Sequence, residues 1–208
     1  GTIAAVDIRD EKGRLTVGTP GDFGGFQLGE SIAVDGVCLT VVSFSGNSFA
    51  ADMSAETLNR TSFKQARVNS KVNLERSLTL NQKISGHFVM GHVDQVGTVV
   101  EIDRRSGETL FRFEHPRELQ PHIIEKGSMA VDGISLTVFE CRDNRFTVSI
   151  IPYTLEHTNL HTREIGDKVN LECDMIGKYV YRACEAILGS APKGRGINPD
   201  LLKQHGFV

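Results

Sequence analysis

Residues 33 to 41 read AVDGVCLTV and residues 130 to 138 read AVDGISLTV, so one nine-residue pattern occurs twice in a chain of 208 residues. The two copies lie 97 positions apart and differ at only two places, Val37/Ile134 and Cys38/Ser135. Separated blocks that share one offset indicate an internal duplication, which defines the unit of the fold. The other blocks at this offset are Phe49 with Phe146, Thr57-Leu58 with Thr154-Leu155, and VNLE at 72–75 with VNLE at 169–172.

The segment SGHFVMGHVDQV at 85–96 precedes the second copy and has no counterpart ahead of the first. Gly1-Thr2-Ile3 aligns with Gly97-Thr98-Val99 at an offset of 96. The given sequence therefore lacks the residues with which the first copy of the repeat would begin. The repeat therefore predicts about ten further residues, the initiator Met included, ahead of Gly1.

Each copy is built of short segments in which apolar residues alternate with polar ones. Asp35-Gly36 and Asp132-Gly133 have strong hairpin-turn chemistry and are flanked by such segments. About six short strands in roughly 95 residues predict a small Greek-key barrel that leaves few open sheet edges. A helical turn is expected after Ser54 and another after Pro152. The other expected strands are 47–53, 70–75, 97–103, 108–113, 145–151 and 168–174.

The predicted fold class is therefore all-β: two tandem six-stranded Greek-key barrels related by a pseudo-two-fold repeat, followed by a C-terminal α-helix. The N-terminal barrel is expected over 1–86 and the C-terminal barrel over 87–174. Residues 175–188 carry apolar side chains at helical spacing and have no counterpart in the first copy. This helix either caps the second barrel or joins copies of the chain, and the residues 189–208 are expected to form a flexible tail.

Composition excludes several classes of protein. A net charge of −3 with evenly spread Lys and Arg gives no basic face for nucleic acid, and no apolar run is long enough to cross a bilayer. A cytoplasmic protein with reduced thiols is expected, because the four cysteines show no disulfide or zinc spacing. The five-residue spacing of His87 and His92 fits no metal motif, and phosphate-loop and nucleophile-elbow motifs are absent.

Equal repeats can bind two similar ligands, whereas directional chemistry needs positions at which the copies differ. Cys38 and Ser135 share one repeat position, and Asp174 aligns with Ser77. Cys38 could equally be a small buried apolar residue, but a serine in an apolar strand needs a hydrogen-bond partner. His92 is either structural or a general base, and Asp174 either caps a helix or handles a proton. Thr40 and Thr137 could be ordinary strand residues.

The duplicated AVDG-[IV]-[CS]-LTV blocks, the GHFVMGHV junction, the ETL and YTL turns and the paired VNLE strands resemble the α-chain riboflavin synthase, or lumazine-binding, family over residues 1 to about 188. The resemblance implies a homotrimer held by its C-terminal helix, with no metal and no cofactor, and an association with lumazine synthase. It also implies that two molecules of 6,7-dimethyl-8-ribityllumazine meet in each site, one in the N-terminal barrel and one in a neighbour's C-terminal barrel. A four-carbon unit passes between them, which gives riboflavin and 5-amino-6-ribitylaminouracil.

The resemblance also assigns roles to residues. Ser135 or an activated water supports attack at C7, and His92 and Asp174 handle protons; Thr137 and Cys38 complete the expected catalytic set. An MFTGIV-like opening segment of the family, whose Phe contributes to its active site, is not found here. Substrate contacts are expected at Cys38, Leu39, Thr40, Asp52, Met53, Ser54, Ala55, Glu56 and Thr57 on one side, and at Gly91, His92, Val93, Lys126, Ser135, Leu136, Thr137, Ile150, Ile151, Pro152, Tyr153, Thr154 and Leu155 on the other.

Two rival functions remain open at this point. A non-catalytic lumazine or flavin carrier of the same family would bind the same ligands, but it has no need of Cys38, His92, Ser135 and Asp174 together. The flavin-binding barrel of a reductase is disfavoured by the internal repeat and by the lack of a nicotinamide-binding βαβ motif.

Overall fold

The computed structural model describes residues 1–189, and its contacts divide the chain at Met175. Both repeats lie in one compact unit, Gly1–Met175, and the second unit begins at Ile176. The expected tail 189–208 lies outside the described residues, except for Gly189, the last residue of a helix.

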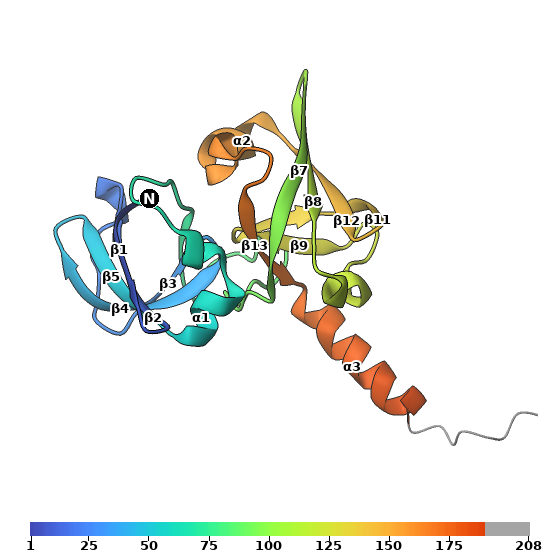
Figure 1. The fold of residues 1–208 in the computed structure, drawn as a ribbon, viewed down its shortest axis with the longest axis horizontal. Helices are drawn as coiled ribbons and strands as arrows, with labels where there is room; N and C mark the ends of the chain where they lie inside the picture. The colour runs from blue at the N-terminus through green and yellow to red at the C-terminus, as the bar shows by residue number, and fades with distance from the viewer. Residues whose placement is uncertain (190–208) are drawn as a thin grey trace, which may run out of the picture. The chain divides into compact units, whose positions relative to one another are not determined.

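The first repeat forms one antiparallel sheet that curls around a common interior (Figure 1). Its strand order is β1-β2-β5-β4-β3-β6, and a bridge from Thr2 to Lys71 joins the two edges of the sheet. The barrel is therefore closed by the chain just ahead of β6. Its strands are β1 Thr2–Arg9, β2 Lys12–Gly18, β3 Ser31–Val34, β4 Val37–Ser45, β5 Ser48–Met53 and β6 Leu74–Arg76.

The second repeat follows the same path with seven strands in the order β10-β9-β13-β7-β8-β12-β11. The extra strand arises because the equivalent of β4 is interrupted at Val138 into β10 and β11. In β4 the matching position, Val41, begins a bulge, so both copies bend at the same place. The strands are β7 Gln95–Arg105, β8 Glu108–Glu114, β9 Ser128–Val131, β10 Ile134–Thr137, β11 Phe139–Arg142, β12 Arg145–Ile150 and β13 Lys168–Cys173.

The predicted all-β fold with a duplicated barrel and a C-terminal helix is confirmed. The expected strand 70–75 is wrong in its bounds, because β6 covers only Leu74–Arg76 and Val72 is buried outside any strand. No bounds were predicted for the strands β1 and β2. They are joined by Asp10 and Glu11, which adopt left-handed conformations (φ 46° and 64°) without the glycine that normally signals such a turn.

Helices follow the predicted turns. Helix α1 spans Ala55–Arg60, and the Ser54 hydroxyl caps it by accepting a hydrogen bond from the Thr57 N–H at 3.1 Å. Helix α2 begins at Pro152, whose missing N–H costs nothing in a first turn. Helix α2 ends at His157. The other helices are α3 Met175–Gly189 and the short 3-10 helices Gly21–Phe23, Ser62–Gln65, Arg117–His122 and Asn159–Thr162.

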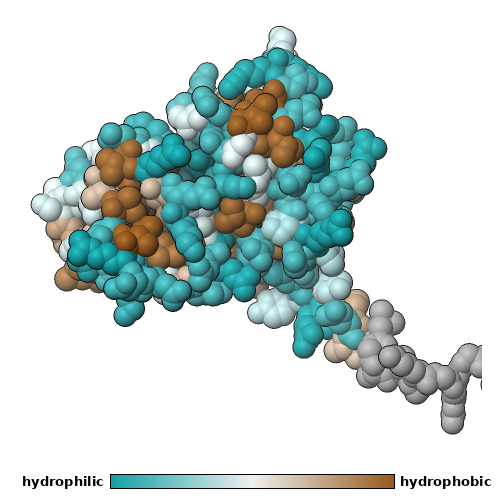
Figure 2. All heavy atoms as spheres, in the orientation of Figure 1, coloured by the Kyte–Doolittle hydropathy of each residue, from teal (hydrophilic) through white to brown (hydrophobic). Residues whose placement is uncertain are grey.

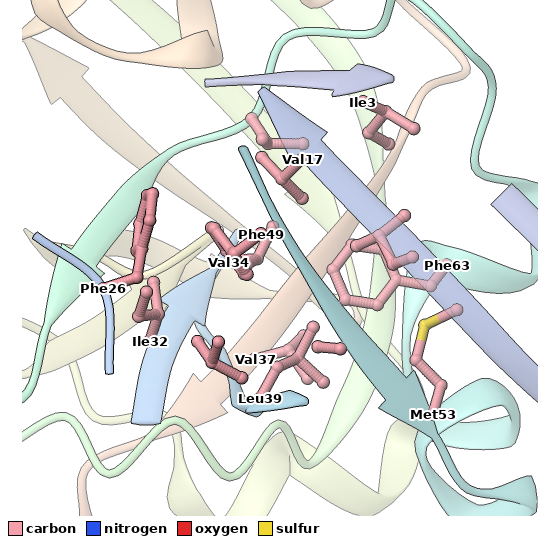
Figure 3. Close-up of a cluster of buried hydrophobic side chains, with 14 of the residues drawn as sticks. Ile3, Val17, Phe26, Ile32, Val34, Val37, Leu39, Phe49, Met53 and Phe63 are labelled. Carbon is pink, nitrogen blue, oxygen red and sulfur yellow. The ribbon is translucent and has the colours of Figure 1, made fainter. Parts of the chain in front are cut away.

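Each repeat has a hydrophobic core of its own. In the first barrel, alternate side chains of β2, β3 and β4 meet Phe49 and Phe63, which are almost fully buried (Figure 3). In the second barrel Phe146 takes the place of Phe49 and packs on Phe113 with ring centroids 5.4 Å apart. The alternation leaves the other side chains of the same strands on the outer surface, where a ligand can reach them.

The two Asp-Gly turns meet where the barrels join. Gly36 and Gly133 pack backbone to backbone, and a Cβ atom added to Gly36 would lie 2.5 Å from the amide nitrogen of Gly133. Both glycines have left-handed φ angles, 73° and 82°. Because these positions are repeat equivalents, the contact lies on the pseudo-two-fold axis that relates the copies.

Helix α3 carries large apolar side chains that are exposed in the single chain, among them Ile176, Tyr179, Val180 and Ile187. None of the helices within residues 1–189 is long and apolar enough to span a membrane.

Candidate binding and catalytic site

The segment 85–93 between the repeats contacts both Cys38 and Ser135, the two residues that occupy one repeat position and differ between the copies. The Cys38 N–H donates a hydrogen bond to the Gly91 carbonyl at 2.8 Å, and a Cβ on Gly91 would lie 2.7 Å from the Cβ of Cys38. A Cβ on Gly86 would lie 2.7 Å from the Cβ of Ser135. Both glycines have left-handed φ angles, so this path across Cys38 and Ser135 requires glycine twice.

His87 is the residue in this segment that contacts Ser135 directly. Its Nδ1 lies 2.7 Å from the Ser135 Oγ, and its Nε2 is buried without a hydrogen-bond partner among the described residues. Burial lowers the pKa of His87, while the negative charges of Asp174 and Glu172 act in the opposite direction. The imidazole is therefore neutral at neutral pH and can exchange a proton with the hydroxyl.

The same segment is fastened to the last strand of the second barrel. The buried carboxylate of Glu172 accepts a hydrogen bond from the Met90 N–H at 2.7 Å, and Asp94 accepts one from the Cys173 N–H at 2.8 Å. These bonds fix residues 90–94 on β13.

A cavity of about 550 Å³ lies beside this segment, and both repeats contribute to its wall. Its lining includes Cys38 from β4, Ser135 from β10, and His87 and Gly91 from the connecting segment. Its volume lies in the range of small-molecule binding sites.

The predicted residues of β4 and β5 divide between the surface and the core. Cys38 and Thr40 are exposed on the outer face of β4, whereas Leu39 and Met53 are buried in the barrel core. Only the backbone of Leu39 and Met53 can therefore contact a ligand. Two other predicted contact residues of the first barrel form ion pairs, Asp52 with Arg14 at 2.6 Å and Glu56 with Arg60 at 2.8 Å. The hydroxyl groups of Ser54 and Thr57 lie 2.9 Å apart, and Ala55 is half-buried.

The second barrel repeats this division. Ile150 is buried, whereas Ile151, Pro152 and Tyr153 are exposed at the start of α2, and Thr154 and Leu155 are half-buried. Brown apolar patches interrupt the teal hydrophilic surface on the face drawn in Figure 2. Of the other predicted contacts, Thr137 is exposed, Leu136 and Val93 are half-buried, and Lys126 places its ammonium 5.1 Å from the centre of the Phe139 ring.

The structure thus brings together Cys38 with Gly91, and Ser135 with His87, on which the negative charge of Asp174 acts. It does not bring His92 to Ser135 by any contact recorded within residues 1–189, and the His92 side chain is exposed. His87 was considered only as a metal ligand from its spacing, so its contact with Ser135 was missed. The signal available was Gly86, whose lack of a side chain permits the chain to pass over Ser135.

Among the described residues, no group of three or more His, Cys, Asp or Glu side chains could hold a metal ion. Cys38, Cys141 and Cys184 are free thiols, as predicted. Burial raises the pKa of Cys141 to about 11, so this thiol stays protonated and unreactive. Cys38 is the exposed thiol beside the cavity.

A duplicated barrel with repeat-equivalent polar groups on one cavity defines a class of small-molecule-binding protein with two similar binding positions. The lumazine binding domain model matches residues 1–77 and 90–174, and the chain belongs to this family. The family expected from the repeated blocks is therefore confirmed.

The similar proteins include riboflavin synthases from several bacteria. The chain is 44% identical over 207 residues to the riboflavin synthase of Actinobacillus pleuropneumoniae, which covers 100% of this chain and 96% of that protein. It is 44% identical over 155 residues to the riboflavin synthase of Bacillus subtilis (strain 168), covering 74% and 72%. Among solved structures, LumP complexed with riboflavin has a TM-score of 0.78 and 26% identity, covering 83% of this chain and 94% of LumP.

Proposed function

We propose that this protein is a riboflavin synthase, a transferase that moves a four-carbon unit between two molecules of 6,7-dimethyl-8-ribityllumazine. The products are riboflavin and 5-amino-6-ribitylaminouracil, which together contain all the atoms of the two substrates. No external oxidant or reductant is then required. The observation that carries the proposal is 44% identity to a riboflavin synthase along the whole chain, together with the Ser135 and His87 pair at the cavity.

The chemistry suits such a site. The C7 methyl group of the lumazine is acidic because its anion is delocalised into the ring, so the protein mainly aligns two rings and moves protons. Ser135 supports attack at C7, and the neutral imidazole of His87 accepts the hydroxyl proton. Asp174 stabilises the imidazolium that forms, since its negative charge already acts on His87.

Each barrel binds one lumazine. Cys38, Thr40 and residues 52–57 hold one molecule on the first barrel, and Ser135, Thr137 and residues 150–155 hold the other on the second. A LumP structure holds 6,7-dimethyl-8-(1'-D-ribityl) lumazine on a similar fold, with a TM-score of 0.76, which supports lumazine as the ligand class.

The binding groups lie on outer barrel faces, so a neighbouring subunit is needed to exclude water from the reacting rings. We assign this role to a homotrimer, in which α3 contributes its exposed apolar side chains to the contact between subunits. An association with lumazine synthase and a cytoplasmic location remain predictions, as does the lack of any cofactor.

The decisive experiment mixes the purified protein with 6,7-dimethyl-8-ribityllumazine alone and follows riboflavin absorbance. One riboflavin should appear for every two lumazines consumed, with no added metal or redox cofactor. Ser135→Ala should slow this rate, whereas Ser48→Ala, on the far end of β5, should leave it unchanged. A different product ratio, or a need for an oxidant, would reject the dismutation.

A non-catalytic carrier is the second candidate, favoured by the likeness to LumP. It predicts lumazine and riboflavin binding without turnover. Fluorescence titration of both ligands beside the rate assay separates the two functions, because only the enzyme consumes the lumazine.

A further inference from the structure

Three residues of the second barrel form one row across neighbouring strands. Ala130 of β9 pairs with Ser135 of β10 on one side and with Glu172 of β13 on the other. Directly opposed residues of antiparallel strands point to the same face of a sheet, so the Ser135 and Glu172 side chains share one face. They stand two strand spacings apart, roughly 10 Å, and the alanine between them adds only a methyl group. A side chain from another segment can therefore lie between Ser135 and Glu172.

His87 reaches this face with one of its two ring nitrogens engaged. Its Nδ1 atom lies 2.7 Å from the Ser135 Oγ, whereas its Nε2 atom is buried and has no hydrogen-bond partner among the described residues. Glu172 is in the same condition. Its Oε1 accepts the Met90 N–H at 2.7 Å, but its Oε2 is buried without a partner within residues 1–189. The negative charge of Glu172 acts on His87, so the two groups are near each other.

The two unpaired atoms are complementary once the proton of His87 is placed. For Nδ1 to accept the Ser135 proton, the single proton of the neutral imidazole must be on Nε2. Nε2–H is then a donor without an acceptor, and the Glu172 Oε2 is an acceptor without a donor. Buried polar atoms are costly when they stay unpaired, and the hydrogen bond of one ring nitrogen determines which nitrogen carries the proton. A carboxylate at Nε2 therefore favours the tautomer in which Nδ1 is free to act as a base.

We propose that Glu172 is a positioning residue for His87: its Oε2 accepts the Nε2–H, directly or through one water molecule, and keeps Nδ1 unprotonated toward Ser135. The inference deepens the proposed function, because it rests on the Ser135–His87 pair. When the Ser135 O–H bond breaks in support of attack at C7, an N–H bond forms at Nδ1. The Nε2 proton stays on the ring and none passes to Glu172, so the positive charge forms beside a negative one.

The first barrel has the same row without the histidine. Ala33 pairs with Cys38 on one side and with Glu75 on the other, so the repeated VNLE strand supplies a carboxylate to both barrels. No hydrogen bond joins the Cys38 side chain to a histidine within residues 1–189. Among the described residues, the complete set of hydroxyl, imidazole and carboxylate thus belongs to the second barrel, which gives the two copies different roles.

Nitrogen-15 NMR of histidine-labelled protein tests the positioning role without any assay of activity. The chemical shifts of the two ring nitrogens show which one carries the proton, and the spectrum of His87→Ala identifies the His87 signals. At a pH where the ring is neutral, the wild type should carry its proton on Nε2. In Glu172→Gln the amide oxygen can still accept the Met90 N–H, but the amide NH2 group faces the ring as a donor, so the proton should move to Nδ1. A wild-type proton on Nδ1, or an unchanged tautomer in Glu172→Gln, would overturn the proposal.

Asp94→Asn is the matched control. Asp94 also fastens the connecting segment to β13, by accepting the Cys173 N–H at 2.8 Å, and asparagine keeps an oxygen for that bond. This variant removes a negative charge from the same region, but the carboxylates whose charges act on His87 are Asp174 and Glu172. The His87 tautomer and kcat should therefore stay as in the wild type. An equal change in both variants would mean that the attachment of the segment, not Glu172, sets the ring.

Kinetics give a second signature. Glu172→Gln should lower kcat by about a hundredfold, the scale of a lost proton-transfer partner, and leave the lumazine Kd within about twofold. Burial lowers the pKa of His87, and the charges of Asp174 and Glu172 oppose this. Because Glu172→Gln removes one of the two opposing charges, the pKa of His87 should fall further and the acid limb of kcat should move to lower pH. A loss of kcat without this shift would reduce Glu172 to a structural residue.

Glu172→Asp keeps the charge and serves if Glu172→Gln does not fold. It should keep the wild-type tautomer and the wild-type acid limb, even where the shorter side chain lowers kcat. A proton on Nδ1 in a folded Glu172→Asp would contradict the role of the carboxylate. If the wild type makes no riboflavin, the proposed function fails, while the NMR spectra still judge whether Glu172 positions His87.

Discussion

The Nδ1 atom of His87 lies 2.7 Å from the Oγ atom of Ser135, and no comparable contact reaches Ser135 from His92 within the described residues. Both histidines stand in the same short segment between the repeats. The half-buried His87 is therefore the histidine that we propose as acceptor of the serine proton.

We therefore expect His87→Ala to lower kcat by about a hundredfold, the usual scale for loss of a proton-transfer partner. His92→Ala should cost less than tenfold, which makes it the matched control. Because burial lowers the pKa of His87, its active neutral form persists below pH ~6.5, and kcat should fall only at lower pH. Riboflavin formation measured against pH in the three proteins checks this, and an equal loss in both variants would exclude the assignment.

The buried pair Asp35 and Asp132 predicts a distinctive dependence of stability on pH. Burial, and then the charge of Asp132, raise the pKa of Asp35 well above its usual value. The folded chain therefore holds a proton that the unfolded chain has released above pH ~4, so stability should decrease as pH rises from there to the raised pKa. Urea unfolding at a series of pH values should show this decrease in the wild type and not in Asp35→Asn.

The reciprocal variant is the control. Arg163 lies 2.5 Å from Asp132 and 3.4 Å from Asp35, so Asp132→Asn leaves a largely buried guanidinium without its nearer partner. Asp132→Asn should lower the free energy of unfolding by an amount close to the ~3–5 kcal/mol of a broken buried ion pair. Asp35→Asn should lower it by less than about 1 kcal/mol. A larger loss from Asp35→Asn would show that Asp35, rather than Asp132, is the carboxylate that needs its charge.

The repeat in the sequence was sufficient to predict the architecture, because Asp35-Gly36 and Asp132-Gly133 mark hairpins directly. It was not sufficient for β1 and β2, since their turn places Asp10 and Glu11 in left-handed conformations without a glycine. The split between β10 and β11 also left no local signal. It depends on a bend at Val138 that the equivalent Val41 shows only as a bulge.

The site was predictable to the extent that it depends on repeat comparison. Cys38 and Ser135 emerged because the copies differ there, and both line one cavity. The role of His87 depends on how residues 85–91 cross the second barrel, and such a path is set by tertiary contacts such as Glu172 with Met90. Sequence spacing between His87 and His92 carries no information about that path.

Gly91 should be intolerant of any side chain. Its φ of 76° costs a non-glycine residue about 1–2 kcal/mol, and the Cβ would also meet Cys38 at 2.7 Å. We expect Gly91→Ala to destabilise the protein by more than about 2 kcal/mol. Gly29→Ala, with a φ of 82° and nothing within 4 Å, should show the cost of the backbone strain alone.

A double variant tests whether the contact with Cys38 is responsible. Cys38→Gly removes the Cβ that the new alanine meets, so it should recover part of the stability lost in Gly91→Ala, as expected for contacting residues. Urea unfolding of the four proteins gives the coupling energy. Additive losses in the double variant would mean that the strain of residue 91, not its contact with Cys38, dominates.

Helix α3 should hold copies of the chain together. Its residues Tyr179, Val180 and Ile187 expose 71%, 57% and 70% of their surface in the single chain, and a helix of this length is marginal without packing partners. Val180→Glu should therefore convert the proposed trimer to monomer in sedimentation experiments, with both barrels still folded. Arg182→Glu, at an exposed charged position that pairs with Glu185, is the control and should remain trimeric.

If a neighbouring subunit completes the site, the monomeric variant should still bind lumazine but lose most of its riboflavin formation. Full activity in the monomeric variant would place both substrates within one chain.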